Sequence, residues 1–329
     1  MKPFEYAAPR DEAGVLALLS PEPGHTEILA GGTDLVPLMQ KMIVTPRRVV
    51  NIKEVAPLRR LTADSQGVVL GAAVTLEEML DAPELASYTA VLEAIRGIDA
   101  LQLISQMTLG GELCRRPQCW YFRNGHGLLA EAGRRVLQGD NRYHAILGND
   151  GPAKFVHASR LAPALMALGA EVRVRGPGQD DEQYLPLADF FRTPRHERER
   201  ETVLAPNQFL THVFLPNAEG WLNATYEVKH GRGPAAPLAA ASAALLLDGG
   251  RVADARVVLG HVAPVPWRSP EAQAELIGRP VSPETAARAG RAAVASATPL
   301  SHNAYKVDLA AVAVERAILK AAGLPTGGF

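Results

Sequence analysis

The sequence contains little cysteine, few aromatic residues and no excess of basic charge, and each shortage excludes a class of protein. Cys114 and Cys119 are its only two cysteines, so we expect no disulfide framework. The formal net charge of -1 leaves no basic field that could neutralise a nucleic-acid backbone. The N-terminal residues lack the apolar stretch of a signal peptide, and no apolar run reaches the ~20 residues that cross a bilayer. We therefore expect a cytoplasmic protein with no membrane span and no nucleic-acid partner.

What the sequence does contain is enough ordinary globular material for two or three cores. Its 329 residues are 47 % hydrophobic and 21 % charged, whereas one domain takes ~100–200 residues. Because aromatic residues make up only 5 % of the chain, we expect aliphatic cores that pack against helices rich in small residues.

Helix and strand patterns alternate in the first half of the chain and then give way to strands followed by helices. The first half has strand patterns at residues 26–30, 48–52 and 67–71, and helical patterns at residues 34–42 and 84–96. Beyond a boundary expected near residues 216–220, strand patterns cover 222–229, 238–247 and 251–260, and helical patterns cover 271–277, 283–296 and 307–322. The Asp248-Gly249-Gly250 turn predicts a hairpin between the last two strands. This order indicates a compact α+β C-terminal domain.

Two segments lack a regular pattern. Residues 110–152 are rich in Gly, Arg, Asn and Asp, and an ordered loop of this length in a compact domain usually carries function. The charged stretch at residues 195–201 is most simply explained as a solvated loop.

Two Gly-Gly turns, far apart in the sequence, carry recognisable binding chemistry. Gly31-Gly32 follows a predicted strand and precedes a predicted helix. Glycine lets the backbone approach a ligand without interference from a Cβ atom, and successive amides at such a turn bind phosphate or pyrophosphate. The turn matches neither the GxGxxG fingerprint nor the Walker A loop, and a Gly-Gly turn alone is more often only a turn. Gly110-Gly111 has similar chemistry, so the two turns could clamp one extended cofactor from opposite sides.

The residues around these turns resemble the flavin subunit of the molybdenum hydroxylases, the xanthine dehydrogenase and carbon monoxide dehydrogenase medium-subunit family. The segment ILAGGTDLVPLM (28–39), followed by RRVVNI (47–52), is similar to the first FAD loop of that family. TLGGEL (108–113) is similar to its second FAD loop, HASRLAPALMALGA (157–170) to its PSDLAPAL segment, and TPLSHNAYKVDLA (298–310) to its C-terminal tail. The match runs through nearly the whole chain in the same order, which makes it far more specific than either turn.

The resemblance implies an α+β fold: a two-subdomain FAD-binding domain of the PCMH type, followed by a smaller α+β domain with an antiparallel sheet and helices. The FAD-binding domain would cover residues 1–217, with subdomains of about 1–55 and 56–217, and the carbon monoxide dehydrogenase flavoprotein-type domain residues 218–329. The resemblance also implies that FAD is bound by residues of both turns and by a few distant ones: Leu29, Ala30, Gly31, Gly32, Thr33, Asp34, Leu35, Ile98, Thr108, Gly110, Gly111, Glu112, Ser159, Leu210 and Lys229. A cation at Lys229 beside the flavin would stabilise its anionic reduced form; an exposed strand lysine is the equally simple alternative.

Two residues depart from the family pattern. Family members often have, where Arg160 stands here, an Asp that reaches the ribityl chain of FAD, so this contact does not carry over. Ser159 is the candidate substitute. Glu112 stands where the second loop usually has Asn or Asp, so only the backbone contact of that position carries over.

The segment 114–123 corresponds to an insertion that in some relatives carries four cysteines for an additional 4Fe–4S cluster. Four thiolates normally hold such a cluster, and this chain has two cysteines, so we expect no cluster and no metal site. A zinc site that recruits His126 or His144 is the less favoured alternative to two reduced, inert cysteines. The aromatic residues 120–122 would then pack this loop against the flavin domain or a partner subunit.

These features predict an oxidoreductase subunit that carries FAD and transfers electrons, with no catalytic acid or base of its own. By resemblance, the molybdenum cofactor and the 2Fe–2S clusters belong to a molybdenum-binding large subunit and a 2Fe–2S small subunit of a hetero-oligomer, and FAD passes electrons to an external acceptor such as NAD. Two alternatives stay open: a self-contained FAD-dependent oxidoreductase, and a non-catalytic interaction subunit that has lost FAD.

Overall fold

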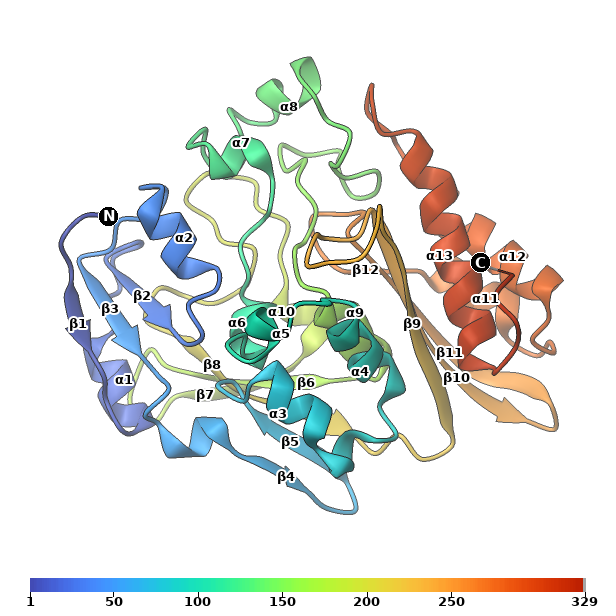
Figure 1. The fold of residues 1–329 in the computed structure, drawn as a ribbon, viewed down its shortest axis with the longest axis horizontal. Coiled ribbons are helices and arrows are strands. Elements are labelled where there is room, and N and C mark those ends of the chain that lie inside the picture. Colours follow the sequence, from blue (N-terminus) through green and yellow to red (C-terminus); the bar gives the residue numbers. More distant parts are fainter. Residues whose placement is uncertain (328–329) are drawn as a thin grey trace.

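The computed structural model of the chain describes residues 1–327, whose strands form a three-stranded, a five-stranded and a four-stranded sheet. In Figure 1 the sheets follow one another from left to right: the N-terminal sheet, the central five-stranded sheet and the C-terminal sheet. The segment of residues 114–159, here called the insertion, projects at the top of the view. The molecule is therefore a row of three layered units, in the order of the sequence.

The N-terminal unit is a small parallel sheet with two helices. Its strands are β1 (Glu5–Ala7), β2 (Thr26–Leu29) and β3 (Arg48–Asn51), in the order β1-β3-β2, and its helices are α1 (Glu12–Leu18) and α2 (Leu35–Gln40). Asp11 caps α1, because its side chain accepts a hydrogen bond from the amide of Gly14 at 2.7 Å. Val15 and Leu16 of that helix are buried against Val50 in a core that this unit shares with Phe209 of the central sheet.

The central unit is an antiparallel sheet covered by helices. Its strands lie in the order β4 (Leu61–Ala63), β5 (Gly67–Gly71), β8 (Phe209–Pro216), β6 (Glu171–Arg175) and β7 (Glu182–Pro186). The helical elements are η1 (Ala56–Arg59), α3 (Leu76–Asp81), η2 (Pro83–Leu85), α4 (Thr89–Arg96), α5 (Leu101–Ile104), α6 (Leu109–Leu113), α9 (Leu161–Ala167) and α10 (Leu187–Phe190). Thr75 and Glu78 form a complete capping box at the start of α3. The largest hydrophobic core of the described chain lies between this sheet and α4 and α9.

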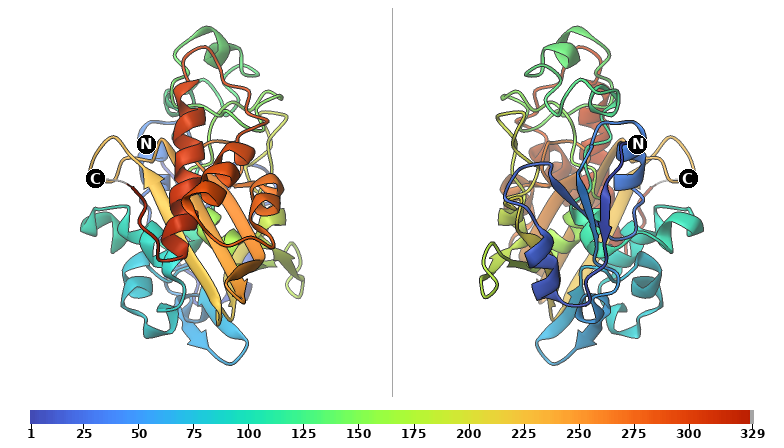
Figure 2. Two further views of the ribbon diagram at one scale, coloured as in Figure 1. Left: turned by 90° about the vertical axis from the view of Figure 1, so that its right-hand side faces the viewer. Right: turned by 90° about the vertical axis from the view of Figure 1, so that its left-hand side faces the viewer.

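Between α6 and α9 the chain leaves the central unit and forms the insertion, residues 114–159. It contains only the short helices α7 (Trp120–Arg123) and α8 (Arg134–Gln138). Both project beyond the sheets in Figure 1 and in the two side views of Figure 2. This agrees with the expectation of a long segment that is ordered but has little regular structure.

The C-terminal unit is an antiparallel sheet in the order β12 (Trp267–Arg268), β11 (Arg251–Gly260), β10 (Ala239–Asp248) and β9 (Trp221–Val228). Gly249 and Gly250 both have positive φ, 54° and 77°, as a two-residue hairpin turn requires. One face of the sheet is covered by α11 (Pro270–Leu276), α12 (Pro283–Ala293) and α13 (Tyr305–Ala321), seen in front of the sheet in the left view of Figure 2. The opposite face packs against α4 and α9 of the central unit.

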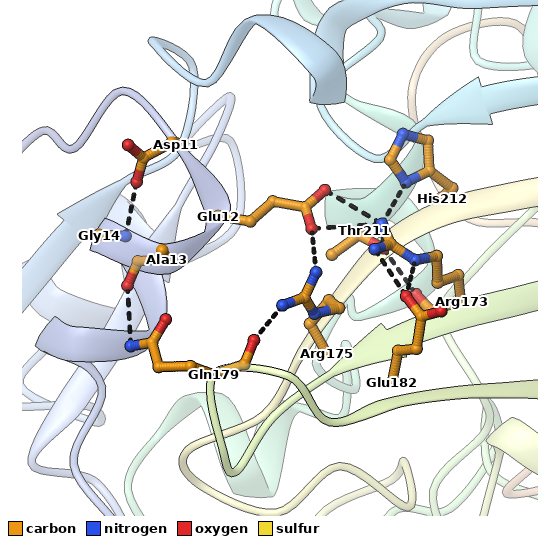
Figure 3. A network of polar contacts seen from close by, with 10 residues as sticks. All are labelled: Asp11, Glu12, Ala13, Gly14, Arg173, Arg175, Gln179, Glu182, Thr211 and His212. Atoms are coloured by element: carbon orange, nitrogen blue, oxygen red, sulfur yellow. Dashed lines mark hydrogen bonds and ion pairs between the residues drawn. The ribbon is translucent and has the colours of Figure 1, made fainter.

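A polar network joins the N-terminal unit to the central sheet (Figure 3). Glu12 of α1 accepts hydrogen bonds from Arg173 at 3.1 Å and from Arg175 at 3.1 Å, both on β6. Arg173 also pairs with Glu182 of β7 at 2.8 Å. The side chains of Glu12, Arg173 and Arg175 are all largely buried. The network therefore holds the N-terminal unit in a fixed position on the central sheet.

The predicted fold class, α+β with an antiparallel C-terminal sheet and helices, is confirmed. Two of the differences from the sequence patterns concern the central unit. The helix predicted at residues 84–96 is split into η2 and α4, and β8 lies in the middle of the central sheet although no pattern had indicated it. Within residues 1–327, no helix is both long and apolar enough to cross a membrane.

Candidate cofactor site

The first Gly-Gly turn contacts the segment that leads into the second. A Cβ atom on Gly31 would lie 1.7 Å from the carbonyl oxygen of Gln106, four residues before Gly110 of the second turn. Gly32 has φ of 73°, a conformation that favours glycine. The close approach of the two backbones is therefore possible only with glycine at position 31, and it brings the first turn against the segment that precedes the second turn.

The first turn presents a row of unbonded amides. None of the backbone N–H groups from Gly31 to Leu35 donates a hydrogen bond to another described residue, and the side chain of Asp34 does not cap α2. These residues are half-buried, so their N–H groups are open to solvent or to a ligand. Consecutive free N–H groups form a concave site for anionic oxygens, so this segment fits a pyrophosphate.

The second turn differs, because both of its glycine amides already donate hydrogen bonds within the protein. Gly110 donates to the carbonyl of Ala72 at 2.8 Å, and Gly111 donates to the hydroxyl of Thr108 at 3.2 Å. Thr108 is the N-cap of α6, and it is buried together with Gly110, while Gly111 is exposed. The amide cradle is thus confined to the first turn, and the second turn supplies packing and side chains.

Asp34 is held by the insertion, a contact that the sequence did not indicate. Its carboxylate pairs with Arg123 at 2.7 Å and accepts from the amide of Arg116 at 3.0 Å and from the side chain of Gln118 at 3.3 Å. These partners are 82 to 89 positions away, so no local spacing could have revealed them. The insertion therefore determines where the first turn sits.

The charged stretch near residue 200 also reaches this region, and its interpretation as a solvated loop is wrong for Glu201, which is buried, while residues 195–198 are exposed. Glu201 is 4 % exposed and pairs with Arg116 at 2.9 Å. Arg200 pairs with Glu27 of β2 at 3.0 Å. Glu197 accepts from the amide of Leu129 in the insertion at 3.1 Å. The stretch thus ties the insertion to the N-terminal unit.

Glu112 and Arg160, the two departures from the family pattern, contact each other. Glu112 has a fully buried side chain that accepts from the amide of Arg160 at 2.7 Å and faces the Arg115 guanidinium at 3.4 Å. Burial raises the pKa of Glu112, and the charges of Arg115 and Arg160 oppose that rise. Ser159, which precedes the N-cap residue Arg160, accepts a hydrogen bond from the amide of Ala162 in the first turn of α9 at 3.1 Å. The side chain of Glu112, and not only its backbone, therefore anchors the second turn.

Lys229 and Ile98 come together at the far end of the same region. The Nζ atom of Lys229 donates to the carbonyl of Gly97 at 2.6 Å, and Ile98 beside it is 2 % exposed. The carboxylate of Glu227 lies close to both Lys229 and Gly97. Its Oε2 atom is 4.0 Å from Nζ of Lys229, and a Cβ atom added to Gly97 would lie 2.4 Å from the same oxygen. With its side chain 21 % exposed, Lys229 is not a freely solvated strand lysine.

The other predicted residues lie at the edges of this arrangement. Leu29, at the end of β2, and Ala30 lead into the first turn, and Thr33 follows the turn. All three residues are half-buried. Leu210 is 4 % exposed in β8, opposite Val174 of β6, with its side chain in the main hydrophobic core that also contains Ile98. A continuous series of contacts therefore runs from the first turn through the second turn, Glu112 and Arg160 to Lys229.

The two cysteines lie in the insertion as free thiols. Burial raises the pKa of Cys114 to about 12, which keeps it protonated. Cys119 has its Sγ atom 3.2 Å from Nε2 of His144, whose pKa burial lowers to about 4. In residues 1–327, no group of three or more His, Cys, Asp or Glu side chains is arranged to hold a metal ion.

An extended anionic cofactor fits these residues, with free amides at one end and Lys229 at the other. Comparison with known proteins identifies it. The family described as "FAD binding domain in molybdopterin dehydrogenase" matches residues 2–218. The chain belongs to this family. The family described as "CO dehydrogenase flavoprotein C-terminal domain" matches residues 224–321.

Individual relatives match along the whole chain. The FAD-binding subunit PaoB of an aldehyde oxidoreductase from Escherichia coli is 29 % identical, over 94 % of this chain and 95 % of the relative. The carbon monoxide dehydrogenase medium chain of Hydrogenophaga pseudoflava is 24 % identical, over 96 % of each. A solved structure of carbon monoxide dehydrogenase from Hydrogenophaga pseudoflava that lacks the Mo-pyranopterin moiety matches the fold with a TM-score of 0.77, over 98 % of this chain and 99 % of that chain at 24 % identity. The chain is an FAD-binding oxidoreductase subunit of the molybdenum hydroxylase type.

Proposed function

We propose that this chain is the electron-transfer subunit of a molybdenum hydroxylase complex, in which its FAD receives electrons from the 2Fe–2S clusters of a small subunit and delivers them to an external acceptor such as NAD. FAD, which accepts and releases electrons, supplies the redox chemistry. The molybdenum cofactor would reside in a large subunit. The relatives support this proposal, because one is an aldehyde oxidoreductase FAD-binding subunit and another a carbon monoxide dehydrogenase medium chain.

The observation that carries the proposal is the row of unbonded amides in the first turn. We propose that the amides from Gly31 to Leu35 hold the pyrophosphate of FAD, and that Lys229 and Ile98 contact its flavin end. The remaining predicted contacts stay part of the proposal: Leu29, Ala30, Thr108, Gly110, Gly111, Glu112, Ser159 and Leu210. The distinct chemistry of the two turns gives each a role, since the first offers N–H donors and the second a buried support.

We propose a division of the chain into an FAD-binding domain, residues 1–217, and a C-terminal domain, residues 218–329. β8 ends at Pro216 and β9 begins at Trp221, so the division falls in a short connection between two sheets. Within the first domain we propose subdomains of about 1–55 and 56–217. The first contains the parallel sheet with the amide-bearing turn, and the second contains the antiparallel sheet.

Coexpression with the neighbouring large and small subunits tests this function. The complex is purified, its flavin, molybdenum and iron contents are measured, and NADH is added without oxygen while the flavin absorption is followed. We expect FAD, molybdenum and iron in one complex, and bleaching of the flavin by NADH. Flavin in the complex without bleaching by NADH would contradict NAD as the acceptor and leave the electron-transfer role intact.

The same purification separates the alternatives. A chain that elutes alone with FAD and whose flavin is reduced by an organic substrate would be a self-contained oxidoreductase, contrary to the proposal. A complex with molybdenum and iron but without flavin would identify an interaction subunit. The variant Gly31→Ala, which places a Cβ against Gln106, tests the site in the same complex, because it should lower flavin content without removing the metals.

A further inference from the structure

A cavity of about 350 Å³ lies at the junction of the central unit and the C-terminal unit. Its walls come from α9, from the connection between β8 and β9, and from β11, β12 and α11. Ligand-binding cavities have volumes of ~300–1,000 Å³ and occur preferentially where domains meet. This cavity therefore has the size and the position of a small-molecule site.

The guanidinium of Arg256 is the unusual group in the wall of this cavity. It lies over the ring of Trp221, 4.5 Å from the ring centroid, and a Cβ atom added to Gly169 would lie 2.5 Å from its Nη1 atom. Within the part of the chain that the structure describes, it has no hydrogen bond and no ion pair, and none of its nitrogen atoms is fully enclosed by protein. Packing thus holds Arg256 in place while its N–H groups stay open to the cavity.

Other arginines of similar burial do not share this feature. Each of the other buried or half-buried arginines among residues 1–327 donates to at least one oxygen atom: Arg48, Arg115, Arg116, Arg123, Arg160, Arg173, Arg175, Arg200, Arg288 and Arg316. A half-buried guanidinium has lost part of its hydration, and an unmatched loss costs free energy. Arg256 therefore lacks an acceptor that every comparable arginine of the described chain has.

A second cation, Arg268, lies on the same face of the C-terminal sheet. Arg268 of β12 stands opposite Val258 of β11, and Val258 is two residues from Arg256, so the two arginines are diagonal neighbours, roughly 7–8 Å apart. Glu171 is the only carboxylate among the described residues that line the cavity, and it forms an ion pair with neither arginine. Two positive charges are thus placed together without a counter-charge from the described chain.

The remaining wall narrows the choice of anion. A free guanidinium fork binds a carboxylate or a phosphate through two parallel hydrogen bonds. Met166, Leu168 and Ala218 contribute hydrocarbon surface beside the arginines. An inorganic phosphate would leave this surface uncovered, whereas a carboxylate with an apolar body would cover it. The cavity therefore favours a small organic acid.

The cavity is separate from the proposed cofactor site. Trp221 begins β9 and Lys229 follows its end, and eight residues of a strand span about 26 Å. Met166 lies near the end of α9 and Arg160 precedes its start. A ligand in this cavity would therefore not occupy the place proposed for FAD.

We propose that this cavity binds a small organic carboxylate with an apolar body. Its carboxylate group accepts hydrogen bonds from Arg256 and Arg268, and its body packs against Met166 and Leu168. This site goes beyond the proposed electron-transfer function and does not depend on it. Because the ligand bridges the central and C-terminal units and binds only the folded chain, it should stabilise the protein against unfolding.

Titration of the purified full-length chain with benzoate tests the site. We expect saturable binding of one benzoate in calorimetry, a melting temperature that rises with benzoate concentration, and at least tenfold weaker binding of the neutral analogue benzamide. Arg256→Gln should weaken benzoate binding about tenfold or more, the usual effect of losing a charged hydrogen bond. Arg268→Gln should weaken it less, because Arg268 is exposed.

Arg316→Gln is the matched control. Arg316 is also half-buried and lies over an aromatic ring, that of Tyr226, at 5.3 Å, but its Nη1 atom is bonded to the hydroxyl of Tyr226 at 2.6 Å. Its substitution removes the same charge and should leave benzoate binding unchanged.

Absence of saturable benzoate binding by the wild type, or equal binding by the wild type and Arg256→Gln, would overturn the proposal. Binding of inorganic phosphate as tight as that of benzoate would overturn the choice of an apolar acid. Should Arg256→Gln fail to fold, Arg268→Gln decides, since unchanged affinity would contradict the site. A wild-type complex without FAD would refute the proposed function and leave benzoate binding intact, so the two failures are distinguishable.

Discussion

At Gly31 the backbone of one loop lies against a carbonyl of another, with no space for a side chain. We expect Gly31→Ala to force the two turns apart, because its Cβ would lie 1.7 Å from the oxygen of Gln106. The free energy of unfolding should fall by about 1–3 kcal/mol, as for other overpacked sites, and flavin retention should fall with it. Urea denaturation and flavin content after gel filtration measure both effects. Gly151→Ala is the control, since nothing lies within 4 Å of that position.

Lys306 is a second residue whose burial has a measurable consequence. Its ammonium group donates to the carbonyls of Tyr143 at 3.4 Å, His144 at 3.1 Å and His261 at 2.8 Å, and so joins α13 to the insertion. Burial lowers the pKa of Lys306 from 10.5 to about 7. Between these values the unfolded chain binds more protons than the folded one, so this residue makes stability rise with pH.

We therefore predict that the stability difference between wild type and Lys306→Met grows in favour of wild type from pH 7 to pH 9.5, by at most about 1.4 kcal/mol per pH unit. Urea denaturation at several pH values measures the difference. The exposed Lys41→Met variant should show no such trend. A difference that stays constant or shrinks with rising pH would show that Lys306 keeps an ordinary pKa in the folded protein.

At the scale of single residues, the sequence could predict the first turn but not the partners of its side chains. Gly31 and Gly32 stand out because glycine allows what other residues do not. The residue type and sequence neighbours of Asp34 do not indicate its partner. Arg123 is 89 positions away in the sequence and is brought to Asp34 only by the tertiary fold. The link between Glu112 and Arg160 could not be predicted for the same reason, because the two residues are 48 positions apart.

Among the elements, the contact between α1 and β6 offers the clearest test. Glu12 bridges Arg173 and Arg175 with its side chain only 14 % exposed (Figure 3). We predict that Glu12→Gln lowers the free energy of unfolding by about 1–3 kcal/mol, because two partly buried guanidinium groups lose their carboxylate. Chemical denaturation measures the loss, and the exposed Glu84→Gln is its control. Equal stability of the two variants would mean that the network contributes nothing.

Elements were predictable where pattern and boundary residues agreed. β5 and β11 have the predicted bounds, because flanking glycines or turns mark their ends. β8 was missed, although it is the strand that joins both halves of the central sheet. Its pairing with β5, which ends 138 positions earlier, depends on tertiary contacts that no local pattern encodes.

For the whole molecule, the two proposed domains share a core. Ala244 and Val258 of the C-terminal sheet belong to the main core of the central unit. Ala90 of α4 donates from its amide to the side chain of Asn223 at 2.8 Å, and its carbonyl accepts from Thr225 at 2.9 Å. An interface of this kind, apolar and internally bonded, makes the domains depend on each other.

We therefore predict that the flavin-free chain unfolds in a single transition. Differential scanning calorimetry should give one peak, with calorimetric and van't Hoff enthalpies in agreement. Two separated peaks, or a C-terminal fragment of residues 218–329 that folds alone, would contradict this prediction.

The ion pair between Arg123 of the insertion and Asp34 beside the first turn has a kinetic consequence. The carboxylate of Asp34 and the guanidinium of Arg123 are partly accessible, with 17 % and 13 % of their side chains exposed, so dissolved ions can screen their attraction. If this pair holds the proposed phosphate cradle closed, sodium chloride should accelerate the escape of bound flavin. We expect the dissociation rate, followed by the gain of flavin fluorescence after dilution, to rise with ionic strength in wild type and to be faster and less salt-dependent in Arg123→Gln.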